Sequence, residues 1–567
     1  MIYHSIVGSS LDKVTLNELI IRNLGPIKDD KISLDDFTFL IGRNNAGKSH
    51  YLKAIELLLS SGTKKDQIAK MQNEKSRPIV IEGRFTGVEK FTGLVTASNH
   101  KNAIEGAIRD GILKVVLTLD PDSGAELGVL NVDGSVHNPA GFSGNLLKVL
   151  PDAISILATA DTTQELADKS TTALGKLKKE VMDSFFQELA GKTKMAMQSL
   201  DEFLNSNDPD LRSKSVAEFE YNLKNEFMGE FSEIAPSIEF VMPDETVISK
   251  EMKIILDDGN KTEVEQKGHG LQRATLLALL KLIANKGQKY AGHPPPIFLV
   301  GEIESYLHPH AQREMARALI QMKERYQVVT TTHSPFVIMP EAIEGFRRVQ
   351  KTVALGSKNI GVDKRTVDVN LIKRHLERRG NIEGLFADRI ILIEGKHDEN
   401  FYERIRSIFE VPFPHGKLTL FVRMDGVKQL RMARKFYKQM CFDDISAVCD
   451  LDYLFCKDLK YLFSEFGFDA NISDELRKDI GWTQDKDPKL EYVIGRIKDL
   501  GKPKRFEEAI KLLRMERIFI LEHGGPEAYF KNDYGLKTGW VNVNSESDLL
   551  EVDFLRELMK TLLVQGM

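Results

Sequence analysis

The chain has 567 residues, of which 42% are hydrophobic and 28% charged, and its formal net charge is -5 at pH 7. This length exceeds a single hydrophobic core and predicts two to four domains, and the composition is that of a globular protein and excludes a disordered chain. No apolar run approaches the roughly 20 residues that cross a bilayer, and no basic-then-apolar leader begins the sequence, so we expect a cytoplasmic protein without membrane insertion. The three cysteines, Cys441, Cys449 and Cys456, form no disulfide framework or zinc pattern.

The stretch FLIGRNNAGKSH, at residues 39–50, carries the strongest chemical signal. Gly42, Gly47, Lys48 and Ser49 fit the spacing G-x-x-x-x-G-K-[ST]: backbone amides wrap a phosphate, the lysine reaches the β and γ oxygens, and the serine binds Mg²⁺. The apolar run Phe37–Ile41 predicts a buried strand before the loop, and a helix is predicted after it, so phosphates would meet a helix N-terminus. The residues expected at this nucleotide site are Asn44, Asn45, Gly47, Lys48 and Ser49.

Alternating β-rich runs and turns surround this loop. From about residue 160 to 235 the pattern changes to long, polar, glycine-poor helices, which predict an inserted arm that packs on its own domain or on a second copy of the chain. Strands are predicted at 14–21, 31–41, 78–85, 112–119, 238–242, 253–256, 297–300 and 389–393, and a helix is predicted from Gly270.

Lysine and arginine are concentrated between residues 345 and 380. A local basic surface suffices to neutralise phosphates, so the negative net charge does not exclude nucleic acid. The run is interpreted either as a solvated face or connector between domains, or as a DNA track.

Three further motifs follow the loop. Residues 267–273, KGHGLQR, form a glycine turn leading into a helix, whose N-terminus would face phosphate. Residues 297–304, IFLVGEIE, read as an apolar strand ending in carboxylates, and LHP follows at 307–309. Residues 328–335, VVTTTHSP, predict a strand that delivers His333.

With the loop, these motifs resemble the ABC-type ATPases that include the structural-maintenance and Rad50-like proteins. The strings GHGLQR, LHP and TTHSPF are most similar to the overcoming-lysogenisation-defect (OLD) ATPases. The resemblance implies that Lys48 and Ser49 bind phosphate and Mg²⁺. It also implies that Glu302 orients the attacking water and that His333 senses the γ-phosphate.

In this family the glycine turn completes the nucleotide site of a second protomer. The resemblance therefore implies a homodimer or higher homo-oligomer to which the turn contributes Gly268, Gly270 and Gln272. Gly301 departs from the family pattern, because an acidic residue usually stands there, and so does Ile303, where proline is common. Loss of that carboxylate weakens Mg²⁺ positioning, so we expect ATP binding with slow or absent hydrolysis.

A second group of carboxylates lies in the last third of the chain. The predicted strand at 389–393 ends in Glu394, at the edge where α/β sheets hold ligands, and Asp398 follows one helical turn later. Residues 445–452, ISAVCDLD, again predict an apolar strand that ends in acidic residues. In an extended strand, Asp450 and Asp452 project to the same side. Clustered carboxylates repel one another unless a cation such as Mg²⁺ or Mn²⁺ lies between them.

This E…D-x-D arrangement resembles the Toprim domain of topoisomerases, primases and nucleases, and an IEGKHD string after the ATPase core is the order found in OLD-family nucleases. The resemblance implies a metal site of Glu394, Asp398, Asp450 and Asp452. The alternative is that Glu394 caps its own helix and the aspartates are ordinary loop residues.

The same resemblance implies a late acidic residue and a lysine that stabilises developing negative charge. Glu527 is preferred over Glu522 because it follows the turn in FILEHGGPE. Lys537 is the candidate lysine, with Lys531 as its rival.

We therefore expect an α/β protein with an ABC-type ATPase domain at 1–385, carrying the helical insertion at about 160–235, and a Toprim domain at 386–567. The expected function is a Mg²⁺- or Mn²⁺-dependent DNA endonuclease regulated by ATP, in antiphage or mobile-element defence, with a possible companion protein or nucleic acid. The alternatives are a nucleotide-switched DNA-binding or repair protein, and an effector whose nuclease works only with a partner.

Overall fold

The computed structural model of the chain describes residues 13–131, 134–157, 293–530 and 545–563, apart from 303, 306, 364, 379, 414–416, 425, 427–428 and 485. Parts of 199–217 and 255–275 are also described. Several predictions fall outside these residues: most of the helical arm at 160–235, the strand at 238–242, Gly270, and Lys537 with its rival Lys531.

The first part of the chain builds a mixed sheet of 12 strands, in the order β7-β6-β5-β4-β1-β2-β14-β13-β3-β12-β11-β8. Strands β13, β3, β12, β11 and β8 are parallel, whereas the others pair antiparallel. The strands are β1 (Thr15–Leu24), β2 (Ile27–Ser33), β3 (Phe37–Ile41), β4 (Ile79–Thr86), β5 (Ile112–Asp120), β6 (Gly124–Leu130), β7 (Val136–His137), β8 (Ala153–Leu157), β11 (Ile297–Gly301), β12 (Gln327–Thr332), β13 (Phe346–Thr352) and β14 (Gly356–Gly361).

Helix α1 contacts strands from both the parallel and the antiparallel region of this sheet. The α-helices of the first part are α1 (Lys48–Leu59), α2 (Lys65–Met71), α3 (Ser98–Ala107), α4 (Phe142–Leu147), α10 (Pro309–Met322) and α11 (Val369–Leu376). A separate hairpin joins β9 (Ile255–Asp257) to β10 (Lys261–Glu263), and short 3₁₀ helices span Val88–Leu94, Val264–Gln266, Pro340–Gly345 and Glu383–Phe386.

Most predicted strands of the first part are confirmed, but the single strand expected at 31–41 is wrong. The chain turns between β2 and β3, because the hydroxyl of Thr38 accepts a hydrogen bond from the backbone N–H of Asp35 at 3.0 Å. The turn lets β2 pair with β1 at the antiparallel region while β3 enters the parallel region.

The second part of the chain contains a parallel sheet of four strands, in the order β16-β15-β17-β18. The strands are β15 (Arg389–Ile393), β16 (Thr419–Arg423), β17 (Asp444–Cys449) and β18 (Ile518–Ile520). The helices are α12 (Lys396–Ile408), α13 (Leu430–Gln439), α14 (Lys457–Phe466), α15 (Asn471–Asp479), α16 (Leu490–Leu500), α17 (Phe506–Met515) and α18 (Val552–Leu563), with 3₁₀ helices at Leu451–Phe455, Pro526–Tyr529 and Glu546–Asp548.

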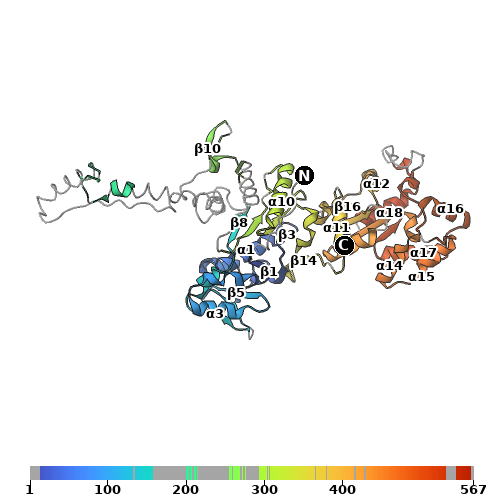
Figure 1. The fold of residues 1–567 in the computed structure, drawn as a ribbon. Helices are drawn as coiled ribbons and strands as arrows, with labels where there is room; N and C mark the ends of the chain where they lie inside the picture. Colours follow the sequence, from blue (N-terminus) through green and yellow to red (C-terminus); the bar gives the residue numbers. More distant parts are fainter. Residues whose placement is uncertain are drawn as a thin grey trace, which may run out of the picture.

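The two sheets lie beside each other (Figure 1) and share one apolar core. A single cluster of buried side chains runs from the large sheet through α11 and the 3₁₀ helix before β15 into α13 and β17. A displacement of one sheet is therefore transmitted to the other through packed side chains.

The basic run at 345–380 divides into two kinds of residue. Arg347 and Arg348 are 7% and 6% exposed and bond to backbone carbonyls, so they connect elements of the fold. The side chain of Arg365 is 92% exposed and belongs to a solvated face. The connector interpretation holds for Arg348, whose partners Met440 and Cys441 lie in the second part of the chain, whereas Arg347 bonds within the first part.

Among the described residues, every helix is too short or too polar to cross a membrane. Cys449 is buried at the end of β17, as expected for a structural thiol. Burial raises the pKa of this thiol well above its usual range.

Candidate nucleotide site and carboxylate cluster

The loop between β3 and α1 has the backbone that its glycines predict. Gly47 is the N-cap of α1 with φ 100°, and Gly42 has φ 148°. A methyl group on Gly42 would lie 2.3 Å from the carbonyl oxygen of Val349 in β13, so the loop passes directly over that strand. Both positions require glycine.

The side chain of Lys48 bonds to the backbone of its own loop. Its Nζ donates to the carbonyl oxygens of Gly42 at 3.1 Å and Arg43 at 3.0 Å, and lies 2.7 Å from Nε2 of His333. Burial lowers the pKa of Lys48 to about 8, against the opposing effect of Glu302 and Glu304. A bound phosphate would offer the ammonium anionic oxygens in place of these carbonyls.

His333 links Lys48 to Glu302. Its Nε2 lies 3.0 Å from Oε1 of Glu302, so the ring nitrogen either accepts from Lys48 or donates to the carboxylate, depending on its proton. Burial lowers the pKa of His333, and Lys48 lowers it further. Glu302 has a left-handed backbone with φ 48°, a strained conformation that is concentrated at functional sites.

Glu304 is a site residue that the sequence interpretation did not assign. It is 7% exposed, and its Oε1 accepts from the hydroxyl of Thr332 at 2.6 Å and from the backbone N–H of His333 at 2.9 Å. Burial raises the pKa of Glu304. The second glutamate of the GEIE string was the available signal, and its carboxylate fixes the backbone that presents His333.

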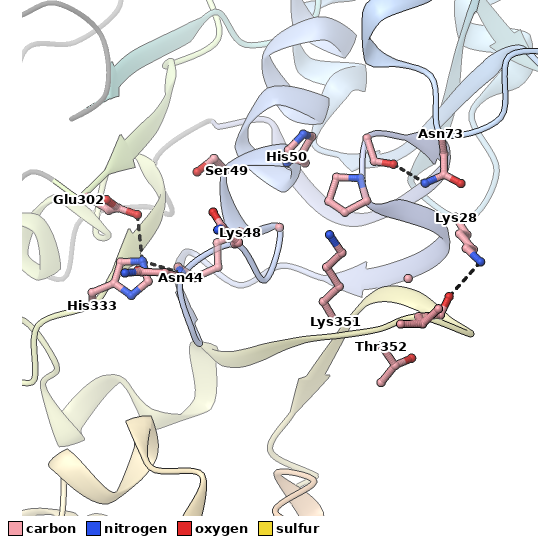
Figure 2. A pocket seen from close by; sticks show the side chains of 16 residues that line it. Lys28, Asn44, Lys48, Ser49, His50, Asn73, Glu302, His333, Lys351 and Thr352 are labelled. Atoms are coloured by element: carbon pink, nitrogen blue, oxygen red, sulfur yellow. Dashed lines mark hydrogen bonds and ion pairs between the residues drawn. The ribbon is translucent and has the colours of Figure 1, made fainter. Parts of the chain in front are cut away.

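A cavity of about 1020 Å³ opens over the loop, large enough for a nucleotide. Figure 2 shows Lys48 and Ser49 between Glu302 and His333 on one side and His50, Lys351 and Asn73 on the other. The predicted residues that line it are Asn44, Asn45, Gly47, Lys48, Ser49, Glu302 and His333. Gly268 and Gln272 belong to another segment and do not line it.

The second site forms where β15 and β17 end. Oε1 of Glu394 accepts a hydrogen bond from the backbone N–H of Asp450 at 3.1 Å, so the two strand ends meet as the parallel register requires. Asp398 lies in the first turn of α12, and its Oδ2 accepts from the N–H of Gly395 at 2.7 Å. The N-cap of α12 is Gly395, and the carboxylate that bonds to its N–H is that of Asp398, not that of Glu394.

The expectation that Asp450 and Asp452 share one side of an extended strand is wrong. Strand β17 ends at Cys449, and a 3₁₀ helix begins at Leu451, whose N–H donates to the carbonyl of Gly524 at 3.2 Å. Asp452 nevertheless lies close enough to act electrostatically on Glu394. The tight turn, rather than strand alternation, directs it there.

Glu527 lies against Asp450, whereas its rival Glu522 does not belong to the cluster. A methyl group on Gly525 would lie 2.8 Å from Oε2 of Glu527 and 3.0 Å from Oδ2 of Asp450. Glu522 forms ion pairs with Lys502 at 3.0 Å and Arg514 at 3.1 Å. The carboxylates that the structure gathers are Glu394, Asp398, Asp450, Asp452 and Glu527.

Burial and mutual repulsion perturb these acids strongly. Burial raises the pKa of Glu394 to about 8, with further increases from Asp452, Asp398 and Glu527. Burial also raises the pKa of Asp398 to about 6 and that of Asp450 well above its usual range. Carboxyl groups with pKa values raised in this way stay protonated unless a bound cation replaces the protons.

The donor set fits a hard divalent cation. All five side chains offer carboxylate oxygens, the ligands that Mg²⁺ and Mn²⁺ prefer, and Gly525 leaves open the space beside two of them. In the part of the chain that the structure describes, no three acidic, histidine or cysteine side chains already stand at the spacing of a closed metal site. A cation would therefore have to draw the carboxylates together.

Comparison with known proteins places the first part of the chain. The model of the AAA ATPase domain matches residues 15–114 and 137–338, more than half of the sequence. The chain belongs to the AAA ATPase domain family. The match covers the phosphate-binding loop, Glu302 and His333, and it confirms the predicted ATPase domain within an α/β fold.

Curated relatives confirm the predicted resemblance to the OLD family. The Old nuclease of Escherichia phage P2 is 24% identical over 68% of this chain and 69% of its own length. The OLD nuclease of Thermus scotoductus is 24% identical over 68% of this chain and 72% of its own length. Endonuclease GajA of Bacillus cereus is 21% identical over 69% of this chain and 67% of its own length.

Solved structures of SMC head domains also align with this chain. The Smc head from Pyrococcus furiosus, bound to the C-terminal domain of ScpA, is 17% identical over 62% of this chain and 97% of its own, with a TM-score of 0.38. The SMC head domain from Thermotoga maritima is 14% identical over 61% of this chain and 99% of its own, with a TM-score of 0.28.

Proposed function

We propose that this protein is a divalent-metal-dependent DNA endonuclease whose activity is regulated by ATP in the AAA ATPase domain. The observation that carries the proposal is the convergence of buried carboxylates at the ends of β15 and β17, with the pKa of Glu394 raised to about 8. The nuclease names of the relatives support a hydrolytic function. The ATPase part would extend to about residue 385 and a Toprim-like nuclease part would follow.

The chain's own residues have distinct roles in this proposal. Glu394, Asp450 and Glu527 would bind the cation, with Asp398 and Asp452 supplying further negative charge. Mg²⁺ or Mn²⁺ held there would stabilise the charge that develops on a phosphodiester under attack. Lys537 would add a positive charge, as the resemblance implies.

In the ATPase part, Lys48 would exchange its carbonyl partners for phosphate oxygens, and Ser49 would ligate Mg²⁺. Glu302 would orient water and His333 would contact the γ-phosphate. Because Gly301 supplies no carboxylate, we propose that nucleotide binding serves mainly as a signal.

Cleavage of supercoiled plasmid DNA with Mn²⁺ tests the proposal. Asp450→Asn should reduce the rate by about 100-fold or more, because it removes a charged ligand. Asp458→Asn is the matched control: Asp458 is also a half-buried acid with a raised pKa, but its carboxylate pairs with Arg431 at 3.2 Å instead of meeting the acids of the cluster. Equal cleavage by wild type and Asp450→Asn would refute the assignment.

A second pair of variants tests the late acid. The single variant Glu527→Gln should lose cleavage activity, as Asp450→Asn does. Glu522→Gln should retain cleavage activity, because the partners of Glu522 are Lys502 and Arg514. The reverse result would transfer the role to Glu522.

We further propose a homodimer through the ATPase domain and helical arm, and a role in antiphage or mobile-element defence, as the resemblance to the OLD family implies. If purified protein cleaves only after a companion protein or nucleic acid is added, the partner-dependent effector is the correct version. Titration of ATP and a non-hydrolysable analogue into the assay determines whether nucleotide promotes or restrains cleavage.

A further inference from the structure

The nucleotide loop and the carboxylate cluster are connected through the opposite ends of the strands that carry the carboxylates. Strands β15 and β17 each have one end at the cluster and one end facing the nucleotide loop. Two contacts, called here the first tie and the second tie, attach these ends to the loop.

The first tie is the ion pair of Arg43 with Asp388. Arg43 lies in the nucleotide loop, and its Nη1 is 3.2 Å from Oδ1 of Asp388, the residue before β15. The other carboxylate oxygen of Asp388 accepts from the N–H of Leu418 at 2.9 Å, and the Asp388 N–H donates to the Leu418 carbonyl at 2.8 Å. Asp388 thus joins the loop to β15 and to the residue before β16.

The second tie is buried. Arg348 lies within β13, and its side chain reaches the second part of the chain. Its guanidinium donates to the carbonyls of Met440 at 2.8 Å and Cys441 at 2.9 Å and stacks 3.6 Å from the centroid of the Phe442 ring. These residues directly precede β17. The nucleotide loop lies on the same strand, because Gly42 packs against the carbonyl of Val349.

The hydrogen bonds of Lys48 compete with phosphate. In the structure, Lys48 donates to the carbonyls of Gly42 and Arg43, the residues that bear on the two ties. A phosphate at the site attracts the same ammonium and removes that donor from both carbonyls. A cavity of about 560 Å³ between the loop, β13 and Asp443 leaves room for the loop to change position.

We propose that nucleotide binding shifts β15 and β17 through the first and second ties, and thereby changes the spacing of the carboxylates at their far ends. Each strand is only five or six residues long and lies in a close-packed core, so it moves as a rigid element. This regulation rests on the proposed function for its purpose, whereas the displacement itself is measurable without nuclease activity.

The first test is hydrogen exchange at residues 394–400 and 450–456, which follow the two strands, with and without a saturating non-hydrolysable ATP analogue. In wild type, exchange in both segments should change by about two-fold or more. Asp388→Asn should abolish the response of 394–400, because asparagine retains the acceptor for Leu418 and loses the charge that holds Arg43. Loss of an exposed ion pair of this kind changes an equilibrium constant by up to about five-fold, which sets the largest effect expected on the exchange response.

Asp443→Asn is the matched control. Asp443 lines the same cavity, and among the described residues it forms no ion pair, so it reproduces the change of charge without breaking the first tie. Nucleotide affinity, measured with a fluorescent analogue, should stay within about two-fold of wild type in Asp443→Asn and should change by no more than about five-fold in Asp388→Asn, so a saturating analogue still occupies both variants. Arg348→Lys should weaken the response of 450–456, with thermal melting to confirm that it folds.

The proposal is wrong if nucleotide leaves both segments of the wild type unchanged, or if Asp388→Asn responds as fully as Asp443→Asn. In the cleavage assay, the ratio of rates with and without nucleotide should move toward one in Asp388→Asn. If the wild type binds nucleotide and responds in exchange but never cleaves DNA, the proposed function fails and the coupling stands.

Discussion

Gly525→Ala isolates the geometry of the carboxylate cluster from its chemistry. The new methyl group would lie 2.8 Å from Oε2 of Glu527 and 3.0 Å from Oδ2 of Asp450, whereas ordinary contact begins at 3.4 Å. The glutamate oxygen must therefore withdraw by about 0.6 Å and the aspartate oxygen by about 0.4 Å. Every charge of the cluster is retained.

Displacements of this size matter more for catalysis than for folding. Disturbing the surroundings of metal ligands typically costs about 10- to 100-fold in metal affinity or activity, and a misplacement of about 1 Å can cost about 100-fold in rate. Gly525 has φ −95°, so alanine fits the backbone and should even stabilise the fold by about 0.4–1 kcal/mol. We expect unchanged or improved stability with at least about 10-fold weaker Mn²⁺ binding and cleavage.

The measurements are Mn²⁺ titration calorimetry, plasmid cleavage and thermal melting. Gly495→Ala is the matched control, because Gly495 lies in α16 and a methyl group there meets nothing within 4 Å. The control should gain up to about 1 kcal/mol of stability and keep full activity. Wild-type Mn²⁺ affinity and cleavage in Gly525→Ala would refute the cluster geometry.

Three more predictions follow from the two sites. The pKa of Glu394, raised to about 8, means that the folded metal-free protein retains a proton that the unfolded chain releases above about pH 4.5. The free energy of unfolding should therefore fall by about 1.4 kcal/mol per pH unit between about pH 4.5 and pH 8 because of this proton, and saturating Mn²⁺ should abolish this pH dependence. A free energy of unfolding that rises over this range in denaturant titrations of the metal-free protein would contradict the prediction. Because the pKa of Lys48 is lowered to about 8 and phosphate favours the ammonium, nucleotide affinity should weaken by up to about ten-fold per pH unit above 8; pH-independent binding up to pH 9.5 would refute this. ATP turnover should lie at least about 100-fold below a typical 10 per second because of Gly301, and brisk phosphate release that vanishes in Glu302→Gln would overturn that expectation.

Local sequence determined the elements that bear the two sites. Phe37–Ile41 is an unbroken apolar run and forms β3 with the predicted bounds, and Arg389–Ile393 does the same for β15. Near-continuous apolar runs are typical of strands that are buried on both faces of a parallel sheet. The glycines of the nucleotide loop were equally readable, because their positions set the backbone that phosphate requires.

Long-range contacts decided what the residues at those positions do. The sequence placed Asp450 and Asp452 on one strand, but the carbonyl of Gly524 draws the chain into a 3₁₀ helix after Cys449. Glu304 could be assigned to His333 only when β11 and β12 were side by side. A local pattern contains no information about a partner that is distant in the chain.

The division between sequence and structure is clearest at the links between the two sites. By itself, the sequence determined a phosphate-binding loop, the strand ends with their acidic residues and the resemblance to the OLD family, since each depends on neighbouring residues. Only the tertiary structure showed Glu527 beside Asp450, Glu522 bound elsewhere, and Arg43 and Arg348 attached to the second part of the chain. Burial and charge act through space, so their effects exist only after the chain has folded.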